Sequence, residues 1–186
     1  FGDTAMQRTI VQAPVPGESA LAELKHWLGI SRPNDDEPLV QLIHASLDIC
    51  EAFTGKAPLQ QSVEEIIPLS STWHELVSRP VREITGAALI TAEGTREAIA
   101  TPSEALEWRL AASGCVRLLH PLEGEGLALQ LVVGIAPDWS GLPAPLRHGI
   151  IQLAAHNFRD REGKAGVVPP ASVTALWRPW REVRFG

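Results

Sequence analysis

The feature that most constrains the fold of this chain is a change of hydrophobic periodicity along it. Between Ser62 and Ile135, apolar residues alternate with polar ones over short runs that turn-forming residues separate, which is typical of β-strands. On both sides of this middle, apolar residues recur at spacings of three and four, as amphipathic helices require. The sequence therefore predicts an α+β fold with an N-terminal helical hairpin, a β-rich middle and C-terminal helices.

The β-rich middle is predicted to contain a series of short strands. They are expected over residues 63–69, 81–91, 95–100, 106–111, 116–119 and 127–135. Glu93-Gly94 and residues 123–126 have the composition of turns between strands. The last run, LALQLVV, alternates over only part of its length, which favours a central strand that is covered on both faces.

Two helices are predicted before the β-rich middle. The first is expected to begin near Ser19, whose hydroxyl can cap free backbone N–H groups. The second is expected to begin at Asn34, because a glutamate three residues later, Glu37, is typical of a capped helix start. Together they form the predicted hairpin over residues 14–55.

The C-terminal part is predicted to contain two further helices. One extends from Pro145 to about Arg161, and a shorter one begins after Ser172 and is halted or kinked by Pro179. We expect all 186 residues to form a single domain, because this length is usual for one. Its parts are the hairpin at 14–55, the β-rich block at 62–135 and the C-terminal helices and tail at 145–184.

Composition places the chain among compact intracellular proteins. Its hydrophobic content of 45% is enough for a buried core, and no apolar run reaches the roughly 20 residues that span a bilayer. The start lacks the pattern of a signal peptide, and residues 1–5, which precede the only methionine, are interpreted as a remnant of recombinant expression. Cys50 and Cys115 lack metal-site spacing and a secretory context, so we predict two buried free thiols.

Motifs for catalysis, phosphate binding and metal binding are weak in this sequence. There is no Gly-x-Ser-x-Gly elbow, and Gly163-Lys164 lacks the other residues of a phosphate-binding loop. None of the six histidines is paired at the spacing of four that helical metal sites use. The sequence therefore predicts no catalytic residues, no cofactor and no metal. A small hydrolase or transferase whose acids or histidines meet only in the fold stays open as an alternative, and a concave site would distinguish it.

The C-terminal segment ALWRPWREVRF carries the strongest signal for binding. From Arg159 to Gly186 the net charge is +3, whereas the preceding residues carry −9. Tryptophan and arginine are enriched at binding hot spots. The candidate protein-binding residues are Trp177, Arg178, Trp180, Arg181, Arg184 and Phe185. Two interpretations stay open: the segment is a protein-binding surface, or its tryptophans close the core and its arginines are solvated. A nucleic-acid site is less favoured because the rest of the chain is acidic.

A further signal comes from ordered groups of residues spread over positions 14–184. In the first half these are Leu21, Ala22, Glu23, Lys25, Leu28, Asp35-Asp36, Leu39, Leu42-Ile43, Ala45, Glu51 and Thr54-Gly55-Lys56. In the second half they are Pro145, Leu153-Ala154-Ala155-His156, Arg161-Glu162, Val173, Ala175-Leu176 and Pro179-Trp180-Arg181. In their order and spacing the chain resembles the head-tail connector (adaptor) family of tailed bacteriophages, which also occurs in gene transfer agents. It departs from that pattern at Asn157, where an aromatic residue is common, and at Pro38.

The resemblance implies a structural subunit and not an enzyme. It implies a ring, commonly a dodecamer, between a portal protein and a stopper or tail-completion protein. It implies that the C-terminal segment grips the portal, which favours the binding interpretation of the Trp/Arg residues. DNA would pass through the lumen without sequence readout, and no membrane is involved. The expected location is the host bacterial cytoplasm during assembly and then the neck of the virion or gene transfer agent particle. A binding module unrelated to phage is a further alternative.

Overall fold

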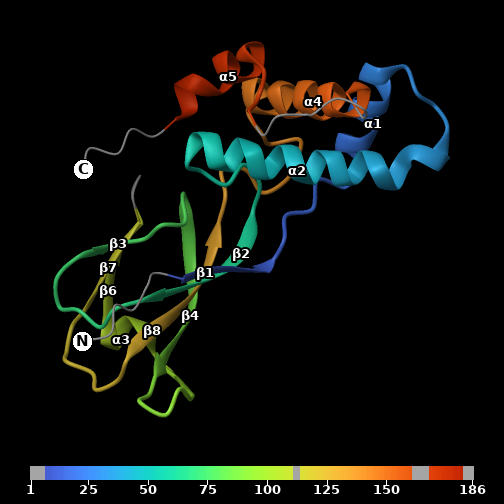
Figure 1. The fold of residues 1–186 in the computed structure, drawn as a ribbon. Helices are drawn as coiled ribbons and strands as arrows, with labels where there is room; N and C mark the ends of the chain where they lie inside the picture. Colours follow the sequence, from blue (N-terminus) through green and yellow to red (C-terminus); the bar gives the residue numbers. More distant parts are fainter. Residues whose placement is uncertain (1–6, 111–113, 161–167, 182–186) are drawn as a thin grey trace. The chain divides into compact units, whose positions relative to one another are not determined.

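The computed structural model describes residues 7–110, 114–160 and 168–181, and the chain divides into two compact units. Unit 1 combines Phe1–Pro14 with Gln61–Gly134, and unit 2 combines Val15–Gln60 with Ile135–Gly186. The two stretches of each unit are therefore far apart in the sequence. The predicted β-rich block falls in unit 1, while the predicted N-terminal and C-terminal helices fall together in unit 2 (Figure 1).

Unit 1 contains a five-stranded antiparallel sheet. Its members are β1 (Gln7–Gln12), β2 (Gln61–Ile67), β4 (Val81–Ile90), β5 (Arg96–Ala98) and β8 (Gly126–Val133). The order is β1-β2-β8-β4-β5, so β8 is the central strand, as its partial alternation predicted. All residues from Gly126 to Leu129 are buried, whereas Gln130 is exposed.

A second, three-stranded sheet completes unit 1. It is formed by β3 (His74–Glu75), β7 (Cys115–Leu118) and β6 (Leu106–Arg109), in that order, and the short helix α3 (Pro102–Ala105) precedes β6. Within these strands the residues Leu106, Val116 and Leu118 are buried, and the alternate residues face outward. Period-two alternation thus gives this small sheet one core face and one outer face.

The α+β class and the predicted strands are confirmed, but the start of the chain differs from the prediction. Each predicted strand has a counterpart, while β1 and β3 were not predicted. The chain therefore opens with a strand that pairs with β2, and not with the helical hairpin. In β1 Arg8 is partly buried and the other five residues are exposed, so the strand lacks the buried alternate residues by which strands are recognised.

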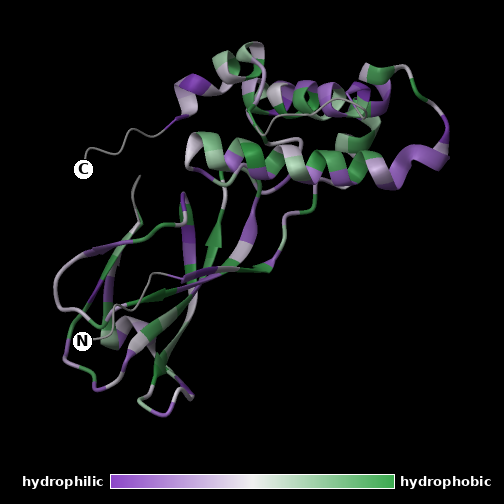
Figure 2. Ribbon diagram, viewed as in Figure 1, coloured by the Kyte–Doolittle hydropathy of each residue, from purple (hydrophilic) through white to green (hydrophobic). Residues whose placement is uncertain are grey.

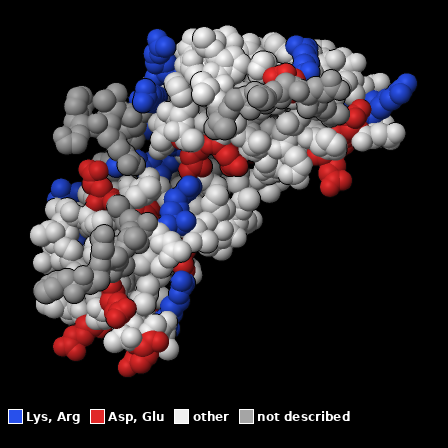
Figure 3. Space-filling view, viewed as in Figure 1, with Lys and Arg blue, Asp and Glu red and all other residues white. Residues whose placement is uncertain are grey.

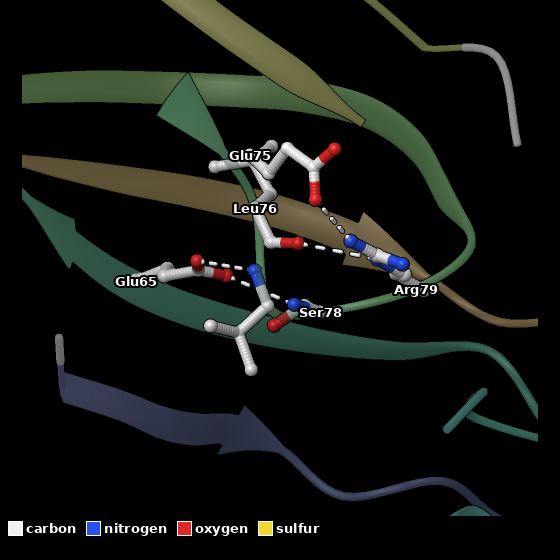
Figure 4. A network of polar contacts seen from close by, with 6 residues as sticks. Glu65, Glu75, Leu76, Ser78 and Arg79 are labelled. Carbon is white, nitrogen blue, oxygen red and sulfur yellow. Dashed lines mark hydrogen bonds and ion pairs between the residues drawn. The ribbon is translucent and has the colours of Figure 1, made fainter. Parts of the chain in front are cut away.

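A buried carboxylate connects β2 to the loop between β3 and β4. The side chain of Glu65 is 0% exposed and accepts hydrogen bonds from the backbone N–H groups of Val77 (2.6 Å) and Ser78 (3.1 Å). Figure 4 shows these bonds beside the buried Arg79, which donates to the Leu76 carbonyl oxygen and to the carboxylate of Glu75. The loop is therefore fixed to β2 by an acceptor that lies inside the protein.

Unit 2 is helical. Its elements are α1 (Gly17–Leu28), η1 (Pro33–Asp35), α2 (Asp36–Thr54), α4 (Ala144–Arg159), α5 (Ala171–Trp177) and η2 (Arg178–Trp180). Hydrophobic residues recur along α2 and α4, while the stretch around η1 is hydrophilic (Figure 2). The buried core is contributed by all four α-helices and includes Leu24, Leu39, Ile43, Leu47, Cys50, Leu146, Ile150, Leu153, Val173 and Trp177.

The helix starts differ in detail from the predicted caps. α1 begins at Gly17 without a side-chain cap, so Ser19 lies inside the helix. α2 begins at Asp36 after the turn η1, and Asn34 belongs to that turn. The Nζ atom of Lys25 on α1 forms an ion pair with Oδ1 of Asp36 at 2.5 Å, which connects α1 to the start of α2. Both predicted helices are therefore present after β1, although no side-chain cap fixes either helix start.

Candidate protein-binding surface

The candidate binding segment forms the last helical element of unit 2. The α-helical part α5 ends at Trp177, two residues before Pro179, as predicted. The chain continues as the 3₁₀ turn η2, which is closed by a hydrogen bond from the Arg181 backbone N–H to the Arg178 carbonyl oxygen (3.2 Å). The sequence thus brings the aromatic and basic residues onto one short, continuous helical segment.

Trp177 is a core residue and not a surface residue. Its side chain is 0% exposed, and its indole N–H donates to the carbonyl oxygen of Leu146 at 3.4 Å. Its ring lies 6.0 Å from that of Phe53 on α2, centroid to centroid. Val173, one turn earlier on α5, is buried on the same side. The Trp/Arg pattern suggested that Trp177 contacts a partner directly. Because Trp177 is buried, its role is instead to anchor α5.

Gly149 on α4 makes room for the Trp177 indole. A Cβ atom at Gly149 would lie 2.2 Å from Nε1 of Trp177 and 2.8 Å from Cε2, which are distances that real atoms do not adopt. Small size at this position is therefore required by packing against a rigid ring.

We expect Gly149→Ala to lower the free energy of unfolding by about 1–3 kcal/mol, because the overpacked methyl group forces α5 or α4 to shift. Alanine is the better helix former by about 1 kcal/mol, so the sign of the change reports which effect is larger. Thermal or urea denaturation measures it. Gly141→Ala is the matched control, because a Cβ there meets only ordinary contacts at 3.6 Å or more. Equal stability of the Gly149 variant and the parent would contradict this account of the packing.

The residues that follow Trp177 do reach the surface. Arg178 and Arg181 are exposed, and Trp180 is partly buried against the core of unit 2. The guanidinium carbon of Arg181 lies 5.7 Å from the centroid of the Phe53 ring, within the range of a cation–π contact. We call Arg178, Trp180 and Arg181 the C-terminal surface. Arg184 and Phe185 lie outside the described residues.

A small hollow on unit 2 bears on the enzymatic alternative. It has a volume of about 240 Å³ and is lined by Trp27, Gln152, His156, Arg159, Pro170, Ser172 and Val173. Its described lining residues include one histidine and one arginine and no carboxylate. General acid–base and nucleophilic catalysis need several titratable groups that converge on one point, so this hollow offers little chemistry.

The two cysteines and the possible metal ligands are the other candidates for chemistry in the part of the chain that the structure describes. Cys50 is buried, and desolvation raises the pKa of its thiol well above the ordinary value, with a smaller contribution from the charge of Glu51. Cys115 is only partly buried, which differs from the prediction of two buried thiols. Within residues 7–110, 114–160 and 168–181, no group of three or more histidine, cysteine or acidic side chains is placed to hold a metal ion.

No helix in the described parts of the chain has both the length and the apolar character needed to cross a membrane.

Comparison with solved structures identifies proteins that share this fold. A chain from the neck of an empty gene transfer agent (GTA) particle, computed with C6 symmetry, is similar with a TM-score of 0.76 and 22% identity, over 96% of this chain and 97% of that one. A chain from the virion of a native GTA particle gives a TM-score of 0.75 with 23% identity. A chain from the neck of a native GTA particle, computed with C12 symmetry, gives 0.70 with 24% identity.

These likenesses extend over nearly the whole of each chain and confirm the fold that the resemblance implied. No protein-family model matches the sequence. No curated protein matches it either.

Proposed function

We propose that this chain is a structural subunit of the neck of a phage-like particle, a head-tail connector, and not an enzyme. The observation that carries the proposal is the shared fold, over 96% of this chain, with a chain from the neck of a GTA particle. Fold alone does not determine function. Two further observations support the proposal: the ordered residues that resemble the connector family span positions 14–184, and the described lining of the hollow on unit 2 contains no carboxylate.

The proposed subunit assembles into a ring. Two of the similar structures are GTA necks computed with C6 and C12 symmetry, which supports a ring with twelve as the expected number of subunits. One side of the ring contacts the portal, and the other contacts a stopper or tail-completion protein. DNA passes through the lumen without sequence readout, since the net charge of −6 offers little attraction for phosphate.

The test is a reconstitution with the portal encoded in the same gene cluster. Mixed with that portal, the purified chain should form a ring-shaped complex that electron microscopy resolves. A well-folded chain that fails to bind the portal would count against the connector function.

We further propose that the C-terminal surface binds the portal. It combines two exposed arginines with a half-buried tryptophan, and the segment is anchored through Trp177. An anchored segment loses less conformational entropy on binding than a free one, so more of its contact energy appears as affinity.

Replacing Arg178 and Arg181 with alanine should weaken portal binding by about 2 kcal/mol or more, which is roughly a thirtyfold change in affinity. Both side chains are exposed, so the melting temperature should change little. Surface plasmon resonance or sedimentation with the portal measures the effect. Arg32→Ala is the control, because Arg32 is also exposed and lies near η1 instead. An unchanged affinity in the double variant would exclude the C-terminal surface as the portal contact without affecting the ring proposal.

A further inference from the structure

The small sheet of unit 1 carries a stacked aromatic and basic cluster on its outer face. The guanidinium carbons of Arg109 on β6 and Arg117 on β7 lie 4.3 Å and 4.8 Å from the centroid of the Trp73 ring. Arg117 also donates to the carboxylate of Glu107, at 2.5 Å and 2.8 Å. We call Trp73, Arg109 and Arg117 the basic cluster. Its residues come from three separate parts of the chain, so the fold alone assembles it.

Arg109 differs from Arg117 in having no acidic partner among the described residues. Its guanidinium lies over the Trp73 ring, and its side chain is exposed. Stacking on an indole satisfies the face of the guanidinium but leaves its N–H edge free, and that edge is suited to a carboxylate. The cluster therefore presents a pre-oriented cation that can accept an acidic group from outside this chain.

A complementary acidic surface lies elsewhere on the same unit. Glu93 in the β4–β5 turn and Glu123 and Glu125 in the loop before β8 are all exposed. The backbone N–H of Glu125 donates to the carbonyl oxygen of Ile90 at 2.8 Å, so the loop lies against the end of β4. Figure 3 shows acidic side chains gathered at this end of the unit. We call Glu93, Glu123 and Glu125 the acidic tip.

Arg109 and the loop that carries Glu123 and Glu125 lie at opposite ends of the β6–β7 pairing. In that pairing Arg109 is opposite Cys115, whereas the loop leaves from Leu118, which is opposite Leu106. Three residues of strand separate Cys115 from Leu118 by about 10 Å. A single copy therefore carries two different surfaces, one centred on Arg109 and the other on three glutamates.

A ring requires this kind of arrangement. Each subunit in a ring meets its neighbours through two different surfaces, because head-to-tail contacts are heterologous. We propose that the basic cluster of one copy binds the acidic tip of the next copy, with Arg109 pairing with a carboxylate of that tip. This inference rests on the proposed ring and identifies the surfaces that would close it.

The cluster favours a protein ligand over nucleic acid. Glu107 lies within it, paired with Arg117, and Glu75 is on the adjoining strand β3, so phosphate would meet carboxylates as well as arginines. Binding to DNA depends on several cations that together displace counterions, whereas Arg117 is neutralised by Glu107 and Glu75 pairs with Arg79, so that Arg109 alone is left to pair with a carboxylate. Tryptophan and arginine together are instead typical of protein–protein hot spots.

Charge reversal in two separate variants tests the proposal. Arg109→Glu gives a chain whose two surfaces are both acidic, and Glu123→Arg with Glu125→Arg gives a chain whose two surfaces are both basic. Each variant alone should self-associate at least about tenfold more weakly than the parent, because like charges then face each other across the contact. An equimolar mixture should recover association, since subunits can alternate around the ring. Sedimentation velocity and native mass spectrometry measure both effects.

Arg32→Glu is the matched control, because it makes the same change of net charge on an exposed residue of unit 2. Melting temperatures close to that of the parent show that each variant is folded. Parent-like assembly of Arg109→Glu alone, or a mixture that assembles no better than its components, would overturn the proposal. A parent chain that stays monomeric at every concentration would also overturn it. Ring formation on the portal would then still support the connector function, so the two proposals fail separately.

Discussion

Replacement of Trp177 with alanine is expected to lower the free energy of unfolding by about 3–5 kcal/mol, the range for truncating a large aromatic residue in a protein core. The side chain is fully buried, packs beside Phe53 and Gly149, and donates its indole N–H to Leu146. Truncation leaves a cavity among three helices and removes the hydrogen bond from the indole to the Leu146 carbonyl oxygen. Urea denaturation followed by circular dichroism measures the loss.

The control for this variant is Trp27→Ala. Trp27 is 43% exposed and makes an edge-to-face contact with His148 at 5.2 Å, so its removal should cost about 1 kcal/mol or less. A loss at Trp177 no larger than that at Trp27 would contradict the assignment of Trp177 to the core. Because the Trp177 variant is destabilised, its affinity for a portal tests stability and binding together, and the arginine variants are the cleaner probe of the C-terminal surface.

Replacement of Glu65 with alanine is expected to cost about 2–4 kcal/mol, because two backbone N–H groups lose their only described acceptor inside the protein. Those groups belong to Val77 and Ser78, in the loop that leads to β4. Glu65→Gln should be less severe, since an amide offers one oxygen acceptor while its NH₂ group faces a second donor. Chemical denaturation measures the stability of both variants, and hydrogen exchange of residues 76–80 locates the effect.

Glu83→Ala serves as the control for Glu65. Glu83 is an exposed glutamate on β4 of the same sheet, and its replacement should change stability by less than about 0.5 kcal/mol. Equal effects at the two positions would show that the buried carboxylate does not hold the loop.

The glutamates of β2 show what alternation in a sequence can and cannot predict. The strand was predicted from its β-branched residues, and β2 covers most of the predicted range. Val63, Glu65 and Ile67 are buried on one face, while Glu64 lies on the other and pairs with Arg96. Alternation places Glu65 on the same face as Val63 and Ile67, but it does not reveal the donors that satisfy a buried carboxylate there, because they lie 12 and 13 residues away in the loop.

Among the candidate binding residues, too, sequence spacing predicts some positions, while only the fold determines others. The spacing of four between Val173 and Trp177 predicts that both lie on one face of a helix, and both are buried. That spacing could have separated Trp177 from Trp180 before the structure was known. The basic cluster had no such signal, because Arg109 and Arg117 lie on two strands and Trp73 directly precedes a third, and the pairing of these strands brings the three residues together.

Unit 2 is built from two stretches of chain that residues 61–134 separate in the sequence, and this affects the order in which a subunit can fold during synthesis. α1 and α2 leave the ribosome early, and residues 61–134 must be synthesised before α4 and α5 can close the helical core. Trp177 is the last fully buried residue along the described chain, and the C-terminal surface follows it at once. An unfinished chain therefore has neither a closed core nor a complete C-terminal surface. Synthesis order alone would keep incomplete subunits from competing with finished ones during assembly.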